Sequence, residues 1–154
     1  MPQKRTLFME TTEVPAERTA ADISSVLIQS GASQIATDYE QGKITGLRWS
    51  MRVCGRDLLF AMPARVEPIY EILRKRRSGP MFDADKEKLR AKAARVAWRQ
   101  LLRWTQAQMA MIECGMAEPS EVFLPYLQTP GGQSLFEAFK GSEFKMIAAP
   151  ERPQ

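Results

Sequence analysis

The amino-acid sequence predicts an α+β fold, in which three strands lie between an N-terminal helix and several C-terminal helices. Three observations indicate this class. Apolar residues recur at helical spacing in residues 15–30 and 66–77, and between these they alternate with polar residues in residues 44–53. A longer stretch of helical periodicity then runs over residues 85–115. A helix of this length spans roughly 45 Å, so we expect it to be the spine of the domain.

The first helix is expected over residues 15–30. Ile23, Val26 and Leu27 recur on one side of it, and Gly31 follows as a residue that readily ends a helix. The residues that precede this helix, 1–14, are expected to form an N-terminal arm.

Three antiparallel strands are expected next, over residues 33–39, 44–53 and 57–62. The turns between them contain Gly42 and Gly55, where a positive φ is favourable. In the middle strand, one set of residues is apolar (Leu47, Trp49, Met51 and Val53) and the alternate set is polar (Arg48, Ser50 and Arg52). The sheet should therefore have one apolar face and one basic, solvated face.

Two helices are expected after the sheet. The first, over residues 66–77, accepts Pro68 in its first turn and ends in four consecutive cations. The second is the long helix of residues 85–115, for which Asp85 is the expected N-cap and Gly115 the first residue beyond the end.

Short helices within residues 119–127 and over residues 133–140 complete the expected fold. A chain of 154 residues is long enough to bury one apolar core without disulfides or metals. We therefore expect a single domain over residues 15–140, followed by a C-terminal tail of residues 141–154.

Basic charge is concentrated in the middle of the chain. The formal net charge is +4, but residues 65–103 contain twelve basic and five acidic residues, whereas residues 104–154 contain three basic and six acidic residues. Clustered basic charge attracts a polyanion or an acidic protein surface. The sequence alone does not separate these two partners.

Five of these cations fall within one narrow wedge of the long helix, at spacings of four, three, four and four: Lys88, Lys92, Arg95, Arg99 and Arg103. We call these five residues the basic stripe. Two further groups can add to it, Arg48 and Arg52 on the sheet and Arg74, Lys75, Arg76 and Arg77 at the end of the preceding helix. Cations at this spacing can follow a phosphate backbone, so these residues are the predicted surface for nucleic acid or an acidic partner.

Single-stranded nucleic acid would also need aromatic side chains on which its bases can stack. Trp49, Trp98 and Trp104 are available, but each lies on the apolar side of its own element. We therefore assign all three to the core.

Several classes of chemistry are disfavoured. The chain has no histidine, which removes the commonest general base and the commonest zinc ligand. Cys54 and Cys114 have no CxxC partner and are expected to be free thiols, with Cys114 packed at a helix end. No phosphate-binding glycine loop is present. We expect no enzymatic activity, no catalytic residue, no metal site and no cofactor.

No apolar run approaches the roughly 18 residues needed to cross a bilayer. No membrane contact and a cytoplasmic location are therefore expected.

A resemblance covers most of residues 14–140. Its residues are Ala97-Trp98-Arg99, Leu102, Trp104, Ala107-Gln108, Ile112-Glu113, Gly115-Met116 and the run from Glu121 to Leu127, together with Ala64-Arg65-Val66-Glu67 and Gly31-Ala32. In these segments the chain resembles a family of short phage and prophage proteins with no assigned activity. The resemblance implies a viral or mobile-element origin and action inside a bacterial cell, and it transfers no site residue.

Three functional hypotheses follow. The leading one is a non-enzymatic phage accessory protein that binds nucleic acid through a basic helix face. The alternative is a phage inhibitor of a host protein complex, such as an anti-CRISPR or other anti-defence factor. The third is a component of a virion or a homo-oligomer, in which partner copies would hold the terminal segments that otherwise fray.

Overall fold

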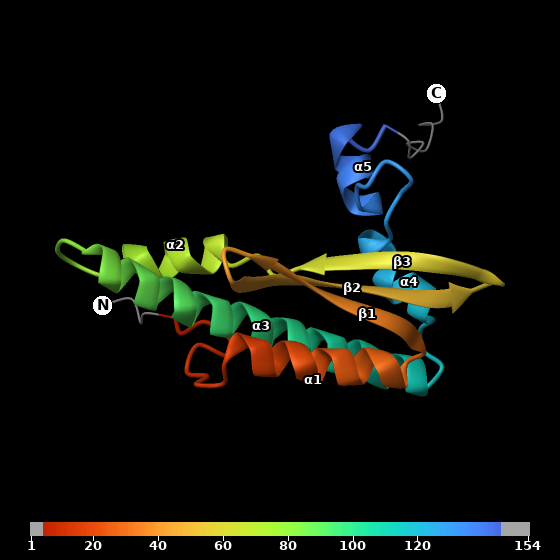
Figure 1. The fold of residues 1–154 in the computed structure, drawn as a ribbon, viewed down its shortest axis with the longest axis horizontal. Helices are drawn as coiled ribbons and strands as arrows, with labels where there is room; N and C mark the ends of the chain where they lie inside the picture. Colours follow the sequence, from red (N-terminus) through yellow and green to blue (C-terminus); the bar gives the residue numbers. More distant parts are fainter. Residues whose placement is uncertain (1–4, 146–154) are drawn as a thin grey trace, which may run out of the picture.

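The chain folds into a three-stranded antiparallel sheet with helices against it, as the alternating and helical patterns of the sequence predict (Figure 1). The computed structural model describes residues 5–145. Its elements are α1 (Ala16–Gln29), β1 (Ala32–Glu40), β2 (Lys43–Val53), β3 (Arg56–Pro63), α2 (Glu67–Lys75), α3 (Asp83–Glu113), α4 (Pro119–Phe123), the 3₁₀ turn η1 (Leu124–Tyr126) and α5 (Leu135–Gly141). The predicted α+β class is confirmed, with strand order β1-β2-β3.

Both hairpins of the sheet use the turn that the sequence predicts. The central residues of the first turn, Gln41 and Gly42, have φ values of 50° and 76°, and those of the second, Cys54 and Gly55, have 49° and 75°. Two consecutive residues with positive φ form a type I′ turn, whose twist matches that of the flanking strands. These turns fix the register that places Trp49 between Ile35 of β1 and Phe60 of β3.

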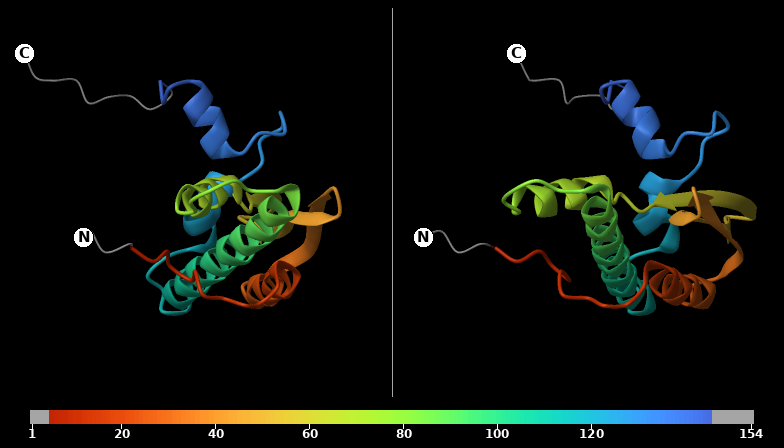
Figure 2. Two further views of the ribbon diagram at one scale, coloured as in Figure 1. Left: turned by 90° about the vertical axis from the view of Figure 1, so that its left-hand side faces the viewer. Right: turned by 60° about the vertical axis from the view of Figure 1, so that its left-hand side comes forward.

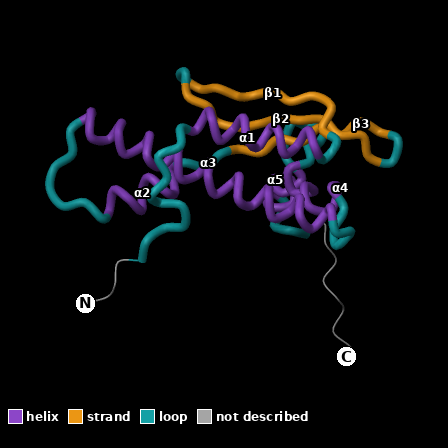
Figure 3. The backbone as a smooth tube through the Cα atoms, turned by 90° about the horizontal axis from the view of Figure 1, so that it is seen from below, coloured by secondary structure: helices purple, strands orange, loops and turns teal. Residues whose placement is uncertain are grey.

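The apolar face of the sheet packs on α1 and α3, which run side by side in the same direction beneath it (Figures 1 and 3). Its centre is an aromatic cluster. Trp49 stacks on Phe60 with ring centroids 5.6 Å apart, and Phe123 of α4 meets the Trp49 ring edge-on at 5.3 Å. Trp98 of α3 is also fully buried. The assignment of Trp49 and Trp98 to the core is therefore confirmed.

A second, smaller core lies at the other end of α3. There α2 folds back against the first half of α3 as a helical hairpin (Figure 3). Tyr70, Leu73, Leu89 and Ala93 are buried between the two helices, and Leu7 of the N-terminal arm packs against them. This contact ties the arm to the hairpin.

The long helix α3 begins earlier than predicted. Asp85 is the third helical residue rather than the N-cap, and its carboxylate accepts a hydrogen bond from the N–H of Phe82 at 3.1 Å. The predicted end is confirmed: Gly115 has a φ of 72°, and its N–H donates to the carbonyl of Ile112 at 3.0 Å. Met116 donates to the carbonyl of Met111 at 2.9 Å, which completes a Schellman motif.

The C-terminal segment crosses the edge of the sheet. Leu127 bridges to Phe60, and the N–H of Gln128 donates to the carbonyl of Leu59 at 2.8 Å. As a result, α4 packs on the inner face of the sheet, whereas α5 lies on the other side (Figures 1 and 2). The expected helix within residues 119–127 is thus divided into α4 and η1. Of the expected terminal segments, residues 1–4 and 146–154 lie outside the described residues.

None of the described helices is both long enough and apolar enough to cross a membrane.

Candidate functional site

The middle of the basic stripe is covered by other elements. Lys88 and Arg103, at its two ends, are exposed. Arg99 is only 18% exposed, and its Nη1 lies 3.8 Å from a carboxylate oxygen of Asp22 on α1. Nε of Arg95 is buried without a hydrogen-bond partner among the described residues. The prediction of five bare cations along one line is therefore wrong for Arg95 and Arg99.

This covering has a non-local cause. α1 buries its apolar side, including Ile23 and Leu27, in the core that α3 also lines. Because the basic stripe borders the apolar side of α3, a helix that packs against this side also shields a neighbouring cation, as Asp22 of α1 does with Arg99. The periodicity of α3 alone does not reveal which helix takes that place.

The N-terminal arm lies beside the next part of the stripe, where its Glu10 and Glu13 line a hollow together with Lys92 and Arg95. Glu10 accepts a hydrogen bond from Nη1 of Arg76 at 2.6 Å and one from the N–H of Leu7 at 2.7 Å. The side chain of Gln100 on α3 donates to the carbonyl of Phe8 at 2.9 Å. The Leu7 N–H and the Arg76 guanidinium hold the pKa of Glu10 below its ordinary value, and Lys92 acts in the same direction. The arm thus places an ionised carboxylate among the cations.

The cations of the sheet are also paired. Nη2 of Arg48 lies 2.7 Å from the carboxylate of Asp38, and Nη1 of Arg52 lies 3.4 Å from that of Asp57. Both arginines are exposed on the solvated face, as expected, but cross-strand carboxylates compete there with any external anion. Arg74 is likewise paired with Glu71 at 2.8 Å, a contact that raises the pKa of Arg74 and lowers that of Glu71.

The three predicted basic groups do not form one surface. β2 runs toward the end of the molecule opposite to the end where α2 finishes (Figure 1). Arg52, near the end of β2, is therefore far from the cations that follow Arg74. The structure therefore separates Arg52 from the rest of the predicted interface.

Six of the predicted cations have no carboxylate within 4.0 Å among residues 5–145: Lys75, Arg77, Lys88, Lys92, Arg95 and Arg103. We call the first four the hairpin cations, because all four lie on the α2–α3 hairpin or its loop; Arg95 is partly shielded, and Arg103 lies at the other end of the stripe. Arg77 and Lys92 share with Arg76 a hollow of about 410 Å³, whose apolar wall is Leu73 and Leu89. Glu10 of the arm lies on its rim. The other end of the stripe, at Arg103, opens into a different hollow.

This second hollow, of about 630 Å³, lies between α3, the link from β3 to α2, and η1. Arg65 and Arg103 line it together with Phe8, Trp104 and Tyr126. We call it the arginine–aromatic hollow. Arg65 was not among the predicted site residues, because a single cation directly after a strand has no periodicity that would mark it.

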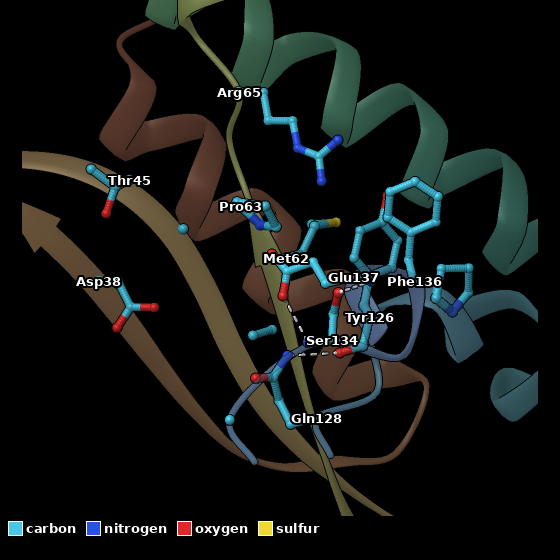
Figure 4. A pocket seen from close by; sticks show the side chains of 14 residues that line it. Asp38, Thr45, Met62, Pro63, Arg65, Tyr126, Gln128, Ser134, Phe136 and Glu137 are labelled. Carbon is cyan, nitrogen blue, oxygen red and sulfur yellow. Dashed lines mark hydrogen bonds between the residues drawn. The ribbon is translucent and has the colours of Figure 1, made fainter. Parts of the chain in front are cut away.

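A third hollow, of about 490 Å³, adjoins Arg65 on the outer side of the sheet (Figure 4). Asp38 of β1 and Glu137 of α5 line it, so it carries both signs of charge. Glu137 is occupied by the cap of α5, where it accepts a hydrogen bond from the N–H of Ser134 at 2.8 Å. This hollow is a mixed polar surface rather than an anion site.

The thiols and acidic groups form no cluster that could hold a metal within residues 5–145. Cys54 and Cys114 are free and exposed. The prediction that Cys114 is packed is wrong, because α3 ends at Glu113 and leaves Cys114 at its exposed C-terminus.

Comparison with protein families, with curated proteins and with solved structures finds no match to this chain.

Proposed function

We propose that this chain is a non-enzymatic phage accessory protein that binds nucleic acid through the hairpin cations. The observation that carries the proposal is that Lys75, Arg77, Lys88 and Lys92 have no carboxylate within ion-pair distance in residues 5–145. Most other predicted cations are paired or shielded. Free cations gathered on one end of a helical hairpin favour a partner that carries repeated negative charge.

The spacing of these cations suits a phosphate backbone. Lys88 and Lys92 are four residues apart on α3, so their Cβ atoms lie about 5–6 Å from each other. Arg77 and Lys92 line the same hollow between the two helices. Lysine ammonium groups bind phosphates as point charges without reading a base, so we expect binding that depends weakly on sequence and strongly on salt.

The phage origin in this proposal rests on the resemblance of most of residues 14–140 to short phage proteins. That family has no assigned activity, so the nucleic-acid partner is argued from the charges alone.

Fluorescence anisotropy tests the proposal. Labelled DNA and RNA oligonucleotides are titrated with the protein from about 50 mM salt upward. The variant that tests the surface reverses three exposed cations: Lys75→Glu, Arg77→Glu and Lys88→Glu. Loss of three phosphate contacts should reduce the slope of log affinity against log salt by about 2–3.

The matched control reverses three exposed cations elsewhere, which also lack a carboxylate within ion-pair distance among the described residues: Lys43→Glu, Arg56→Glu and Lys140→Glu. It changes the net charge by the same amount, so a general electrostatic effect would weaken binding equally in both variants. Equal losses, or no binding by the natural protein at about 50 mM salt, would contradict the proposal.

An acidic protein partner is the other outcome of this test. If nucleic acid does not bind, a stoichiometric host protein captured from nuclease-treated lysate would favour the inhibitor hypothesis. Capture should then fail with the three-charge variant of the hairpin and persist with the control variant.

A further inference from the structure

The arginine–aromatic hollow differs in charge from the other hollows described above. Its lining within the described residues contains no carboxylate, and its only charged members are Arg65 and Arg103. The hollows beside the arm and beside the sheet each include at least one glutamate. An anionic group that enters this hollow would therefore meet no repulsive neighbour in its lining.

Its two arginines are available to a ligand. Arg65 is exposed, with no ion pair or hydrogen bond from its side chain in the described part of the chain. Figure 4 shows this side chain extending toward the side on which Tyr126 and Phe136 lie. Arg103 is exposed as well, and donates one hydrogen bond to the side chain of Gln106 at 2.9 Å. Neither guanidinium is neutralised.

Aromatic side chains line the same hollow. Trp104 packs edge-on against Phe123 at 5.9 Å and against Tyr126 at 5.7 Å, yet it stays partly exposed. Trp49 and Trp98, in contrast, are 1% and 0% exposed. Phe8 is 63% exposed although its carbonyl is held by Gln100. The assignment of Trp104 to the core is thus correct for one part of its surface, while another part faces the hollow.

We propose that the arginine–aromatic hollow takes an unpaired nucleobase of single-stranded nucleic acid. The base stacks against the aromatic side chains of Phe8 and Trp104, and Arg65 and Arg103 pair with the phosphates on its two sides. Its apolar lining residues Ile69 and Leu101 and its volume of about 630 Å³ suit a planar ligand. A base within a duplex cannot expose its face in this way, so the hollow selects single strands.

This inference rests on the proposed function, and it extends that function along α3. Lys92 and Arg103 are eleven residues apart, so they lie within about 20° of each other around the helix and roughly 16 Å apart along it. The arm lies between the two hollows: Phe8 lines one and Glu10 lines the other. One strand can therefore place a base beside Arg103 and phosphates beside the hairpin cations.

The first experiment changes the ligand rather than the protein. A labelled oligothymidylate and an abasic oligonucleotide of the same length carry the same phosphates, but only the first can stack. The natural protein should bind oligothymidylate about fivefold or more tightly than the abasic strand, and more tightly than a duplex of the same length. Binding of oligothymidylate, but not of the abasic strand, should also quench tryptophan fluorescence.

Variants of the lining residues then test which side chains hold the base and the phosphates. Phe8→Ala should reduce the preference for oligothymidylate over the abasic strand at least twofold, whereas Phe82→Ala, which removes another exposed aromatic, should leave it unchanged. Trp104→Phe should keep the aromatic packing and abolish the quenching, because the other two tryptophans are buried. The double variant Arg65→Ala/Arg103→Ala should bind both oligothymidylate and the abasic strand severalfold more weakly. The control double variant Lys43→Ala/Arg56→Ala should bind both strands as tightly as the natural protein does.

Three results would overturn the inference, and they are distinguishable. If the natural protein binds oligothymidylate and the abasic strand equally tightly and with a steep salt dependence, the base site is refuted, whereas the proposal that the hairpin cations bind phosphates is not. If neither strand binds at about 50 mM salt, both the base site and the proposed function are refuted. A preference that survives Phe8→Ala together with quenching that survives Trp104→Phe would place the base elsewhere and would also overturn it.

Discussion

Replacing Glu10 by glutamine separates the structural role of the arm from its electrostatic role. The Glu10 side chain is 14% exposed and joins the arm to Arg76, sixty-six residues away. Glutamine has the same shape, but it carries no charge and has one acceptor oxygen instead of two. The change therefore weakens the attachment of the arm and removes negative charge from beside the hairpin cations.

The expected loss of stability follows from the two charged hydrogen bonds of Glu10. Bonds of this kind contribute about 1.5–3 kcal/mol each, and glutamine keeps part of them, so we expect a loss of about 1–2 kcal/mol at neutral pH. For a chain of 154 residues this corresponds to a decrease in melting temperature of roughly 2–8 °C.

The pH dependence of this difference has a definite sign. The pKa of Glu10 in the folded protein lies below its ordinary value of 4.5, because the Leu7 N–H and Arg76 favour the carboxylate. A depressed folded-state pKa contributes stability that is present above pH 4.5 and is lost as the pH falls through the folded-state value. The stabilities of the natural protein and of Glu10→Gln should therefore converge in acid.

Binding should change in the opposite direction. A carboxylate close to Arg76 and Lys92 repels a phosphate that approaches the same cations. Removing one negative charge next to a bound phosphate should improve the free energy of binding by about 0.5–1 kcal/mol in a well-solvated site. Glu10→Gln should therefore bind nucleic acid roughly two- to fivefold more tightly at low salt. The gain should fade as salt screens the interaction.

Thermal unfolding, followed from neutral to acidic pH, measures the change in stability. Anisotropy titrations of the same samples measure the change in affinity for nucleic acid. Glu118→Gln is the control, since Glu118 is exposed and lies beyond the far end of α3. Unchanged stability at neutral pH would refute the role of Glu10 in holding the arm. Weaker or unchanged binding would refute the position of the anionic partner beside the arm.

Three further predictions concern the fold that positions these surfaces. Phe123→Ala removes a fully buried ring that contacts three other aromatic rings. It should lower the free energy of unfolding, measured in urea, by about 3–5 kcal/mol, and a decrease of less than about 1 kcal/mol would contradict this packing. Gly46→Ala would place a Cβ 3.0 Å from the carbonyl oxygen of Met62 and should lower the free energy of unfolding by about 1–3 kcal/mol. Gly131→Ala, whose Cβ would meet only Oγ1 of Thr129 at 3.9 Å, an ordinary van der Waals distance, should change it almost not at all. Ser134→Ala removes the N-cap of α5 and should speed amide exchange in that helix alone, with a local loss of about 1 kcal/mol.

The features that the sequence predicts well are those fixed by neighbours along the chain. The alternation in β2 identifies its buried face, and Gly42 and Gly55 mark turns that need positive φ. The end of α3 at Gly115 follows for the same reason. The start of α3 was misplaced because two aspartates compete for the first turn, and Asp85 caps the helix from inside it.

The features that the sequence does not predict depend on contacts between distant segments. Arg99 and Asp22 belong to different helices, and no local pattern indicates that α1 would shield the stripe there. Glu10 reaches Arg76 only because the arm packs on the α2–α3 hairpin through Leu7. Charge counting along the chain therefore overestimates the bare basic surface.

The two exposed ends of the stripe differ in chemistry, and this difference makes the two proposals separable. The hollow at the hairpin end is lined by cations and has no aromatic lining residue, so this hollow can hold phosphates but cannot stack a base. The Arg103 end combines guanidinium groups with Phe8 and Trp104, so it can do both. If one strand spans both ends, charge reversal on the hairpin should reduce the salt dependence and leave the preference for bases over abasic sites intact. The change of Phe8 should do the reverse, and a variant that altered both quantities together would show that the two ends are not independent.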